Sequence, residues 1–174
     1  MYKEEKRQEK FENIRNRKQL GTIVKISIII GILVVSGFII YYILTPEPGF
    51  VIFGLLNKEK KAENYPTHAK VNETVSFYVS VENHLNRDFN FKVEILRGDN
   101  ETILTSTGSI GAESYYNTSK VTLSNNQFWM SEMLNVSFSQ PGANQSIIAE
   151  LWEILSSGVD RFYNILYLWL NITA

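Results

Sequence analysis

Two histidines and three nearby carboxylates are the side chains of this sequence best suited to chemistry: His68, His84, Glu63, Glu82 and Asp88. An imidazole beside a carboxylate can bind a cation, transfer a proton or hydrogen-bond a sugar hydroxyl. The sequence has no cysteine, which excludes thiolate ligands, cysteine nucleophiles and disulfides. The histidines also lack the short spacing of a zinc-binding pair. We therefore interpret these groups as hydrogen-bonding residues of turns and strand ends.

Motifs of the common enzyme classes do not occur in the sequence. It contains no phosphate-binding loop, no dinucleotide-binding glycine pattern and no G-x-S-x-G nucleophile elbow. A hydrolase or sugar-active enzyme that uses Glu82, His84 or Asp88 remains an alternative, but no paired carboxylates or nucleophile and base are visible. We predict a protein that is not an enzyme, with no catalytic, cofactor-binding or metal-binding residues and no nucleic-acid partner.

Acceptor sites for N-linked glycans are the strongest local signal. Asn-x-Ser/Thr triplets without a central proline occur six times, all after Thr45. The composition of that part of the chain gives roughly two such triplets by chance. Turns are the most accessible places for modification, so the three asparagines in or beside predicted turns are the best candidates, and Asn171, near the end of a predicted strand, is the poorest. The predicted glycosylation sites are Asn72, Asn100, Asn117, Asn135, Asn144 and Asn171, of which Asn72, Asn100 and Asn144 are the best candidates.

An uncharged stretch of nineteen residues, from Ile26 to Leu44, determines where these groups are placed. At about 1.5 Å per residue, a helix of this length spans the roughly 30 Å hydrocarbon core of a bilayer. Extension back to Ile23 adds only Lys25 as a charge. The stretch is longer than the apolar region of a secretory signal and lacks an A-x-A cleavage pattern. It is therefore predicted to be an uncleaved signal anchor that crosses the cell membrane once.

The charges on either side of this helix predict its orientation. Residues 1–25 hold eight Lys/Arg and four Glu, and the next basic residue after the helix is Lys58. Basic flanks stay in the cytoplasm, so residues 45–174 are expected outside. An alternative comes from Arg17-Lys18-Gln19-Leu20-Gly21, which loosely resembles the processing site of archaeal type IV pilin or archaellin precursors. In that case the protein is a filament subunit, and the mass of its mature N-terminus decides the question.

The chain after the helix alternates apolar and polar residues, as β-strands with one buried face do. Residues 75–84 and 89–95 show the pattern most clearly and are predicted to form an antiparallel hairpin, and residues 146–155 and 161–173 a second one. Further short strands are expected at residues 50–56, 101–105, 120–123 and 134–138, with a bulge or close approach at Gly54. Arg97-Gly98-Asp99, a tripeptide that some adhesion receptors bind, is interpreted as part of a turn.

These elements predict a mainly β protein, in which one N-terminal transmembrane helix precedes an Ig-like, CARDB-like antiparallel β-sandwich of six to eight strands. The predicted parts are a basic cytoplasmic helix (1–22), the transmembrane helix (23–44), a linker with the first strand (45–61) and the extracytoplasmic sandwich (62–174). Residues 1–20 are expected to be a solvated helix rather than one that contacts anionic lipid head groups or a cytosolic partner helix.

Several short motifs resemble a known family. They are Ala62–Thr67 (AENYPT), Glu82–His84, Pro141-Gly142 and Tyr167–Thr173. Together they resemble the C-terminal region of archaeal DUF1616 membrane proteins, whose function is uncharacterised, over roughly residues 50–174. This chain has one membrane helix where those proteins have several. The resemblance implies an archaeal envelope protein with an Ig-like or CARDB-like outer domain, and it implies no reaction.

The features together predict a single-pass, non-enzymatic membrane glycoprotein of the cell envelope. Its outer sandwich is expected to bind or scaffold a partner, as an accessory subunit of a larger membrane complex such as the surface layer or the glycan-assembly machinery. The expected partners are therefore the lipid bilayer, other membrane or envelope proteins and N-linked glycans.

The first prediction concerns glycans and orientation together. Because glycan transfer takes place outside the membrane, the native protein should have an intact mass above the 20.0 kDa of its polypeptide. Asn→Gln changes at occupied sites should remove the excess mass, and Asn100→Gln should change stability by no more than about 0.5 kcal/mol through the polypeptide itself. A native mass equal to that of the bare polypeptide would contradict the glycoprotein prediction.

Overall fold

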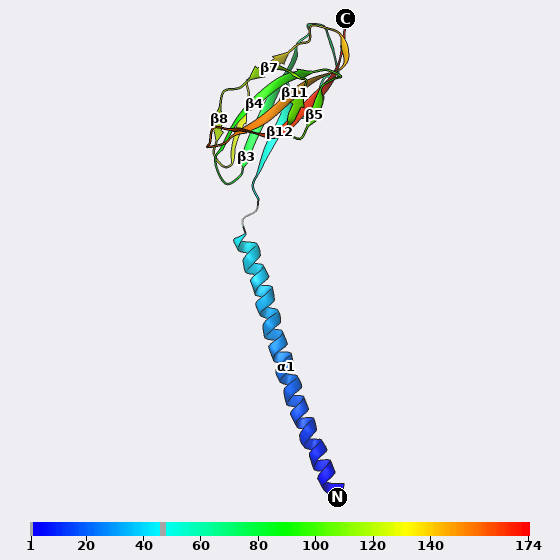
Figure 1. Cartoon of the computed structure of the whole chain (residues 1–174), viewed down its shortest axis with the longest axis vertical. Coiled ribbons are helices and arrows are strands. Elements are labelled where there is room, and N and C mark those ends of the chain that lie inside the picture. The colour runs from blue at the N-terminus through cyan, green and yellow to red at the C-terminus, as the bar shows by residue number, and fades with distance from the viewer. Residues whose placement is uncertain (1, 46–47) are drawn as a thin grey trace. The chain divides into compact units, whose positions relative to one another are not determined.

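The computed structural model describes residues 2–45 and 48–174, with residues 2–19 described by their backbone alone. The chain divides into two compact units between residues 47 and 48 (Figure 1). The first contains a single helix and the second contains all the strands of the described residues. The mainly β fold class with one N-terminal helix is therefore confirmed.

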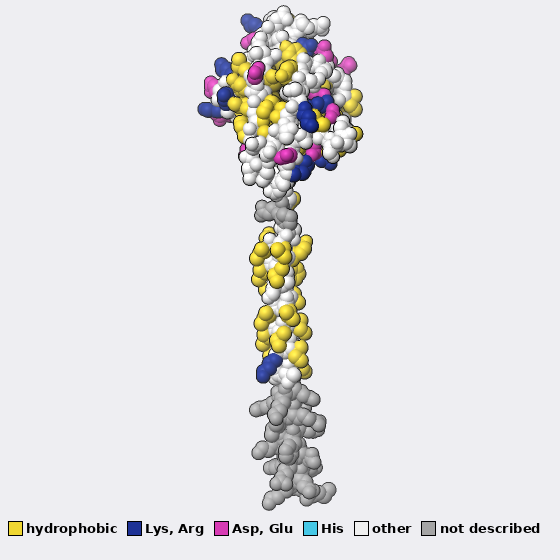
Figure 2. Space-filling model, turned by 90° about the vertical axis from the view of Figure 1, so that its left-hand side faces the viewer, with side chains coloured by type: hydrophobic (Ala, Val, Ile, Leu, Met, Phe, Trp, Pro, Cys, Tyr) yellow, Lys and Arg dark blue, Asp and Glu magenta, His cyan; other side chains and the backbone are white. Residues whose placement is uncertain are grey.

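Helix α1 (Tyr2–Leu44) contains the segment long and apolar enough to cross a membrane, Leu20–Leu44. The apolar side chains of this segment are exposed on all sides of the helix, and Figure 2 shows them along its visible face. A helix that is apolar all round fits a lipid environment better than water. The helix ends where Thr45 bonds back to the carbonyl of Tyr41, just before the Pro46-Glu47-Pro48 segment. The prediction of a solvated helix over residues 1–20 falls mostly on side chains outside the described residues.

The second unit contains twelve strands in its described residues. They are β1 (Phe50–Asn57), β2 (His68–Lys70), β3 (Val75–His84), β4 (Phe89–Gly98), β5 (Ile103–Thr105), β6 (Gly108–Ile110), β7 (Glu113–Asn117), β8 (Val121–Leu123), β9 (Gln127–Met130), β10 (Leu134–Val136), β11 (Gly142–Ile154) and β12 (Asp160–Thr173).

The strands form two sheets and one separate hairpin. Sheet 1 consists of β3 with β1 on one side and β9 and β10 on the other, all antiparallel. Sheet 2 has the order β2-β12-β11-β4-β7, with β8 beside β4, and β5 pairs with β6 in the hairpin. The short strand β2 runs parallel to β12, so the prediction of a purely antiparallel sandwich is wrong at this edge. Sheet 1 begins with β1, which pairs with β3 over its whole length, so the sandwich starts at residue 50 rather than at residue 62.

The core lies between the two sheets and follows the alternation seen in the sequence. The inward side chains of β3 and β4 are buried, and those of Phe89, Phe91, Val93 and Ile95 have no exposed surface. From the C-terminal hairpin, Leu168, Leu170 and Ile172 complete this core, while their neighbours Tyr167 and Trp169 stay exposed. Burial of each large apolar side chain contributes about 1.5–3 kcal/mol, so this layer is the main source of stability.

Strands β3 and β4 do not form the predicted hairpin. Strand β3 pairs with β1, β9 and β10, whereas β4 pairs with β11, β7 and β8. The loop at residues 85–88 therefore crosses from sheet 1 to sheet 2. An alternating pattern shows which face of a strand is buried but not which strand lies beside it. Here the two apolar faces are buried against each other across the sandwich.

Asn83 holds this crossing loop in place. Its side chain faces inward, is completely buried and makes three hydrogen bonds. The Nδ2 atom donates to the carbonyl oxygens of Arg87 (2.7 Å) and Leu123 (2.9 Å), and Oδ1 accepts from the backbone N–H of Leu85 (2.9 Å). One amide thus satisfies part-buried backbone groups on the loop and a buried carbonyl at the end of β8.

Other differences from the prediction lie where the sequence lacks a clear period. The sequence does not predict strands β6, β7 and β9, and every residue of β7 is exposed, so no alternation marks it. Strand β11 starts at Gly142 and contains a register shift before Gln145, where Asn144 has a φ of 57°. Strand β1 keeps a regular register through Gly54, so the glycine marks a close approach to Ser80 and not a bulge.

The second prediction tests the role of Asn83. Replacement of Asn83 by Ala should lower the free energy of unfolding by about 2–4 kcal/mol, because the buried carbonyl of Leu123 and the part-buried carbonyl of Arg87 and N–H of Leu85 lose their partner. Urea unfolding followed by tryptophan fluorescence would measure the change. Asn90→Ala is the control, since Asn90 makes a single exposed hydrogen bond with Thr122, and it should cost less than about 0.5 kcal/mol. Equal effects of the two changes would contradict this role.

Candidate functional site

The structure brings together only two of the five residues first considered for chemistry. His84 Nε2 lies 2.8 Å from Glu82 Oε1, and its Nδ1 lies 2.9 Å from Asn126 Oδ1. The imidazole ring also packs against Phe50, with 4.8 Å between the ring centroids. Both ring nitrogens thus have protein partners, and the imidazole has the surroundings of a structural group at a strand end.

The remaining three residues lie apart from this pair and from one another. His68 bonds to Thr67 at the start of β2, and Glu63 lies 3.7 Å from Lys61 on the surface. Asp88 is exposed in the crossing loop. Within the described part of the chain, no group of three or more His, Asp or Glu residues is arranged to hold a metal ion.

The six acceptor asparagines are all exposed and fall into two groups. Asn72, Asn100, Asn144 and Asn171 lie toward the end of the sandwich opposite the start of β1, where β3 begins and β12 ends. Asn117 and Asn135 lie on the edge strands β7 and β10. The sequence predicts Asn144 beside a turn, but it lies within β11, and Asn72 has a φ of 62°. The exposure of these side chains is compatible with modification.

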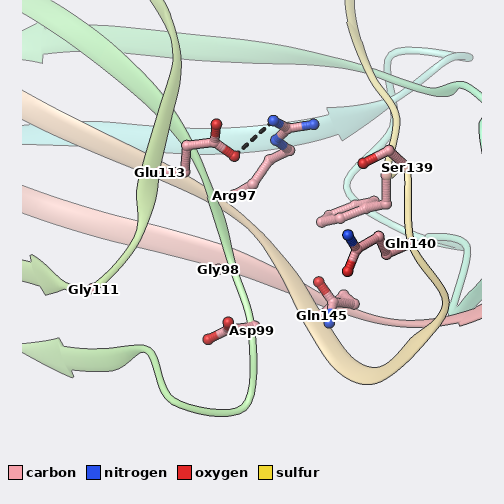
Figure 3. A pocket seen from close by; sticks show the side chains of 9 residues that line it. Arg97, Gly98, Asp99, Gly111, Glu113, Ser139, Gln140 and Gln145 are labelled. Atoms are coloured by element: carbon pink, nitrogen blue, oxygen red, sulfur yellow. Dashed lines mark hydrogen bonds and ion pairs between the residues drawn. The ribbon is translucent and has the colours of Figure 1, made fainter.

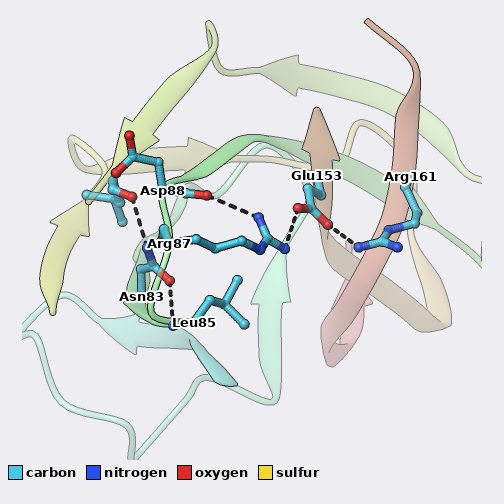
Figure 4. A network of polar contacts seen from close by, with 7 residues as sticks. Asn83, Leu85, Arg87, Asp88, Glu153 and Arg161 are labelled. Atoms are coloured by element: carbon cyan, nitrogen blue, oxygen red, sulfur yellow. Dashed lines mark hydrogen bonds and ion pairs between the residues drawn. The ribbon is translucent and has the colours of Figure 1, made fainter. Parts of the chain in front are cut away.

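A buried carboxylate joins the strands at the end of the sandwich where the chain enters. Glu153 on β11 is only 3% exposed and is bonded by Arg87 (2.8 Å) and by Arg161 (Figure 4). Burial by itself raises the pKa of Glu153, but the hydrogen bonds and positive charges of Arg161 and Arg87 outweigh it and lower that pKa below its ordinary value. The pair of arginines thereby ties the crossing loop to β11 and β12.

Lys92 forms a second ion-pair cluster near the same end. Its Nζ lies 2.8 Å from Asp160 and 3.0 Å from Glu94, and both carboxylates raise the pKa of Lys92. The ammonium also lies 5.9 Å from the centre of the Trp152 ring. Every charge in this cluster has an opposite charge within hydrogen-bonding distance, which is typical of a structural network.

A polar hollow of about 270 Å³ opens at the edge of the sandwich, beside the end of β4 (Figure 3). Arg97 continues the inward alternation of β4, so its guanidinium lies between the sheets at their rim. It donates to Glu113 (2.7 Å) and to the carbonyl of Ser137 (3.0 Å), which fixes its position. Its Nε is buried and has no hydrogen-bond partner among the described residues. The amides of Gln140 and Gln145 line the same hollow.

A second, more apolar hollow of about 280 Å³ adjoins the first along the edge. It is lined by Tyr115 and Tyr116 of β7 and by residues in and before β10, which include the carboxylate of Glu132 as well as Met133 and Asn135. The Arg97 guanidinium lies 4.9 Å from the centre of the Tyr115 ring and so links the two hollows. We call the two hollows together the edge groove.

Strand edges that pair with no other described strand border this groove. Strand β7 is the outermost strand of sheet 2, and β10 is outermost in sheet 1. An outermost strand offers a row of backbone N–H and C=O groups to any extended chain that comes alongside. The edge groove therefore combines backbone hydrogen-bonding groups, an apolar hollow and a fixed guanidinium, which are the components of a peptide-binding site.

Sequence reasoning misses the edge groove. It assigns Arg97 to a turn, whereas β4 continues to Gly98 and the turn begins at Asp99. The continued alternation from Phe89 to Arg97 is the available signal, because it places a charged residue on an inward position. The role of Tyr115 and Tyr116 depends on β7, which has no period to reveal it.

Comparisons with known proteins give one match by sequence and several by structure. A family model described as a domain of unknown function (DUF1616) matches residues 42–171. The comparison with curated proteins found no match. A CARDB domain from Pyrococcus furiosus, crystallised in complex with di-metal ions, is 15% identical and has a TM-score of 0.46, covering 74% of this chain and 97% of that one.

Two further solved structures are similar at a lower level. A β-glucosidase from Erythrobacter marinus is 12% identical with a TM-score of 0.45, and the match covers 72% of this chain but only 16% of the glucosidase. The soluble domain of PmoD from Methylocystis sp. is 11% identical with a TM-score of 0.40, covering 73% of this chain and 95% of that one. Similarity of this degree concerns the fold and carries no argument about activity.

The third prediction concerns the pH dependence of stability through Glu153. Its pKa in the folded protein lies below its unfolded value of about 4.3, so its contribution is present above that pH and is lost as the pH falls through the folded pKa. Glu153→Gln should lower the free energy of unfolding at pH 7 by about 1–3 kcal/mol and make the loss of stability below about pH 4.5 shallower.

Urea unfolding between pH 3 and pH 7 would measure this dependence. Glu63→Gln is the control, because the exposed pair of Glu63 with Lys61 should contribute less than about 1 kcal/mol. This change should not alter how the free energy of unfolding falls at low pH. If the stability of the Glu153→Gln variant falls at low pH as steeply as that of the original protein, Glu153 does not account for the loss of stability in acid.

Proposed function

Because this chain belongs to the DUF1616 family and has one helix long and apolar enough to cross a membrane, we propose that it is a single-pass membrane protein whose β-sandwich binds a partner protein. In this proposal it is a non-enzymatic glycoprotein of an archaeal cell envelope, with the N-terminus in the cytoplasm and residues 45–174 outside. It acts as an accessory subunit of a larger membrane complex, such as the surface layer or the machinery that assembles glycans.

The helix and its flanks support the membrane part of the proposal. All large apolar side chains of Leu20–Leu44 are exposed to the surroundings, which in water would be strongly unfavourable. The eight basic residues up to Lys25 support the cytoplasmic position of the N-terminus, since such residues resist export.

The edge groove is the observation that carries the binding function. An extended segment of a partner can pair with the outer edge of β7 and place an apolar side chain between Tyr115 and Met133. A carboxylate or carbonyl of the same segment can accept from the guanidinium of Arg97, which lines the polar hollow. Tyr115 and Met133 are 41% and 49% exposed, so both keep apolar surface available for a contact.

In this proposal the partner is an extended peptide segment in which an apolar residue lies near a group that can accept a hydrogen bond from Arg97. Main-chain pairing would supply affinity, and the two hollows would supply specificity. A glycan on Asn135 would enter the apolar hollow, so this mode of binding requires that Asn135 be unmodified.

The fourth prediction tests the edge groove in the intact complex. The tagged full chain, purified from native membranes in mild detergent, should co-purify with a stoichiometric partner. The Tyr115→Ala, Met133→Ala double variant should retain at most about a tenth of that partner, since loss of a central apolar contact weakens binding by about 1.4 kcal/mol or more. Native mass spectrometry would report the composition.

A matched control is available on the outer face of sheet 1. Ile52 and Phe128 are similarly exposed, flank Glu82 on the neighbouring strand and lie in the other sheet from β7. The Ile52→Ala, Phe128→Ala variant should keep the partner. Three results would each count against the proposal. The groove variant could retain the partner, the protein of original sequence could purify as a monomer, or a glycan could be found on Asn135.

A further inference from the structure

Three acceptor asparagines from distant parts of the sequence converge on one surface. Asn100 follows β4, Asn144 lies in β11, and Asn171 lies in β12. The backbone N–H of Asn144 donates to Asn171 Oδ1 (3.3 Å). Asn100 and Asn144 line a hollow of about 330 Å³ together with one aromatic residue, Trp169. Sequons from separate elements of the fold thus share one aromatic neighbour.

Trp169 is unusual for a tryptophan on a strand, because the residue is 44% exposed. It lies on the outer face of β12, and the Tyr167 ring packs against it edge-on at 5.7 Å between centroids. Strand β6 lies against β12, and its Ile110, with its cross-strand partner Ile103, adds further exposed apolar surface. Removal of such surface from water is favourable at about 25 cal/mol per Å², so a cover over Trp169 would stabilise the domain.

We propose that Trp169 is the stacking surface for the first sugars of a glycan attached at Asn100. A pyranose ring has one face of C–H groups, and these pack on the electron-rich face of an aromatic ring. Sugar hydroxyls on the other edges of the ring can bond to the side-chain amides of Asn144 and Asn171. This inference rests on the proposal that the protein is a glycoprotein, and it adds the site and the contact.

Asn100 is the attachment point because its sequon is the most accessible of the three. It is exposed in the turn that Thr102 closes by accepting from the backbone N–H of Asp99 (2.9 Å). The sequon at Asn144 has its hydroxyl residue, Ser146, fully buried in β11, and Asn171 already accepts a hydrogen bond within β12. A transferase can therefore reach Asn100 after folding, whereas the other two sequons are held inside strands.

The attachment reaction needs an activated sugar phosphate as donor, supplied with its transferase by the cell. The amide nitrogen of Asn100 forms a bond to the anomeric carbon of the sugar. The bond between that carbon and the donor's phosphate oxygen breaks, and the phosphate leaves with the electron pair. The nitrogen gives up one proton, which passes to solvent through the transferase, so atoms and charges balance.

The test combines site mapping with a double-mutant cycle on the full chain purified from its native membrane. Glycopeptide mass spectrometry should find Asn100 occupied. When Trp169 is unchanged, loss of this glycan by Asn100→Gln should lower the Tm by about 2–4 °C. In a Trp169→Leu background the same change should leave the Tm unchanged, because the glycan no longer has an aromatic ring to cover.

Two controls keep the result specific. Trp169→Phe retains a ring and should restore most of the effect of the glycan on the Tm. Asn117→Gln removes a sequon on β7, away from Trp169, and should have the same effect in both backgrounds. Trp169→Leu should leave the co-purified partner of the edge groove in place, which separates this inference from the binding proposal.

Defined outcomes would overturn the inference. An empty Asn100 beside other occupied sites would leave the glycoprotein proposal standing and remove the proposed contact. Equal Tm shifts for Asn100→Gln with and without the Trp169→Leu change would show that the glycan does not touch the ring. If no sequon carries sugar, the glycoprotein proposal and this inference fail together, while partner binding is judged by its own experiment.

Discussion

The burial of β3 against β4 is the interaction on which the rest of the domain depends. Each strand offers an unbroken row of apolar side chains, and the rows meet face to face between two different sheets. This arrangement requires the chain to cross the sandwich within the few residues between His84 and Phe89. The buried amide of Asn83 satisfies the backbone of that crossing, and Glu153 anchors it through Arg87. Polar groups thus fix the position of an apolar contact that has no directional preference of its own.

The same strand carries the core and the candidate site. Where the inward face of β4 reaches the rim, phenylalanine, valine and isoleucine give way to Arg97, which lies beside Tyr115 and Glu113. The edge groove is therefore a continuation of the core to the surface, and its guanidinium is held by strands that are themselves fixed by the central contact.

Local patterns in the sequence predict the helix, the buried faces of two strands and the family. The apolar run to Leu44 predicts the end of helix α1, the alternation of Val75–Val81 and Phe89–Ile95 predicts two buried faces, and short motifs such as Ala62–Thr67 predict the family. Strand partners depend on distant residues, and so the pairing of β3 with β1 and the parallel pairing of β2 with β12 are not predictable in this way. Strand β7 is not predicted, because an exposed edge strand needs no alternation of apolar residues. The edge groove, which β7 borders, is therefore not predicted either.

The parallel pairing of β2 with β12 has a consequence for the order in which the domain can fold. Strand β2, at residues 68–70, finds its sheet partner only at residues 171–173, and β12 also separates β2 from the rest of sheet 2. Contacts between residues so far apart in the chain form late, because closing a long loop costs entropy before any contact compensates for it. Strand β2 can therefore pair with its sheet only after β12 has been synthesised and has taken its place beside β11. One of the earliest strands of the sandwich is in this way secured by a strand far along the chain.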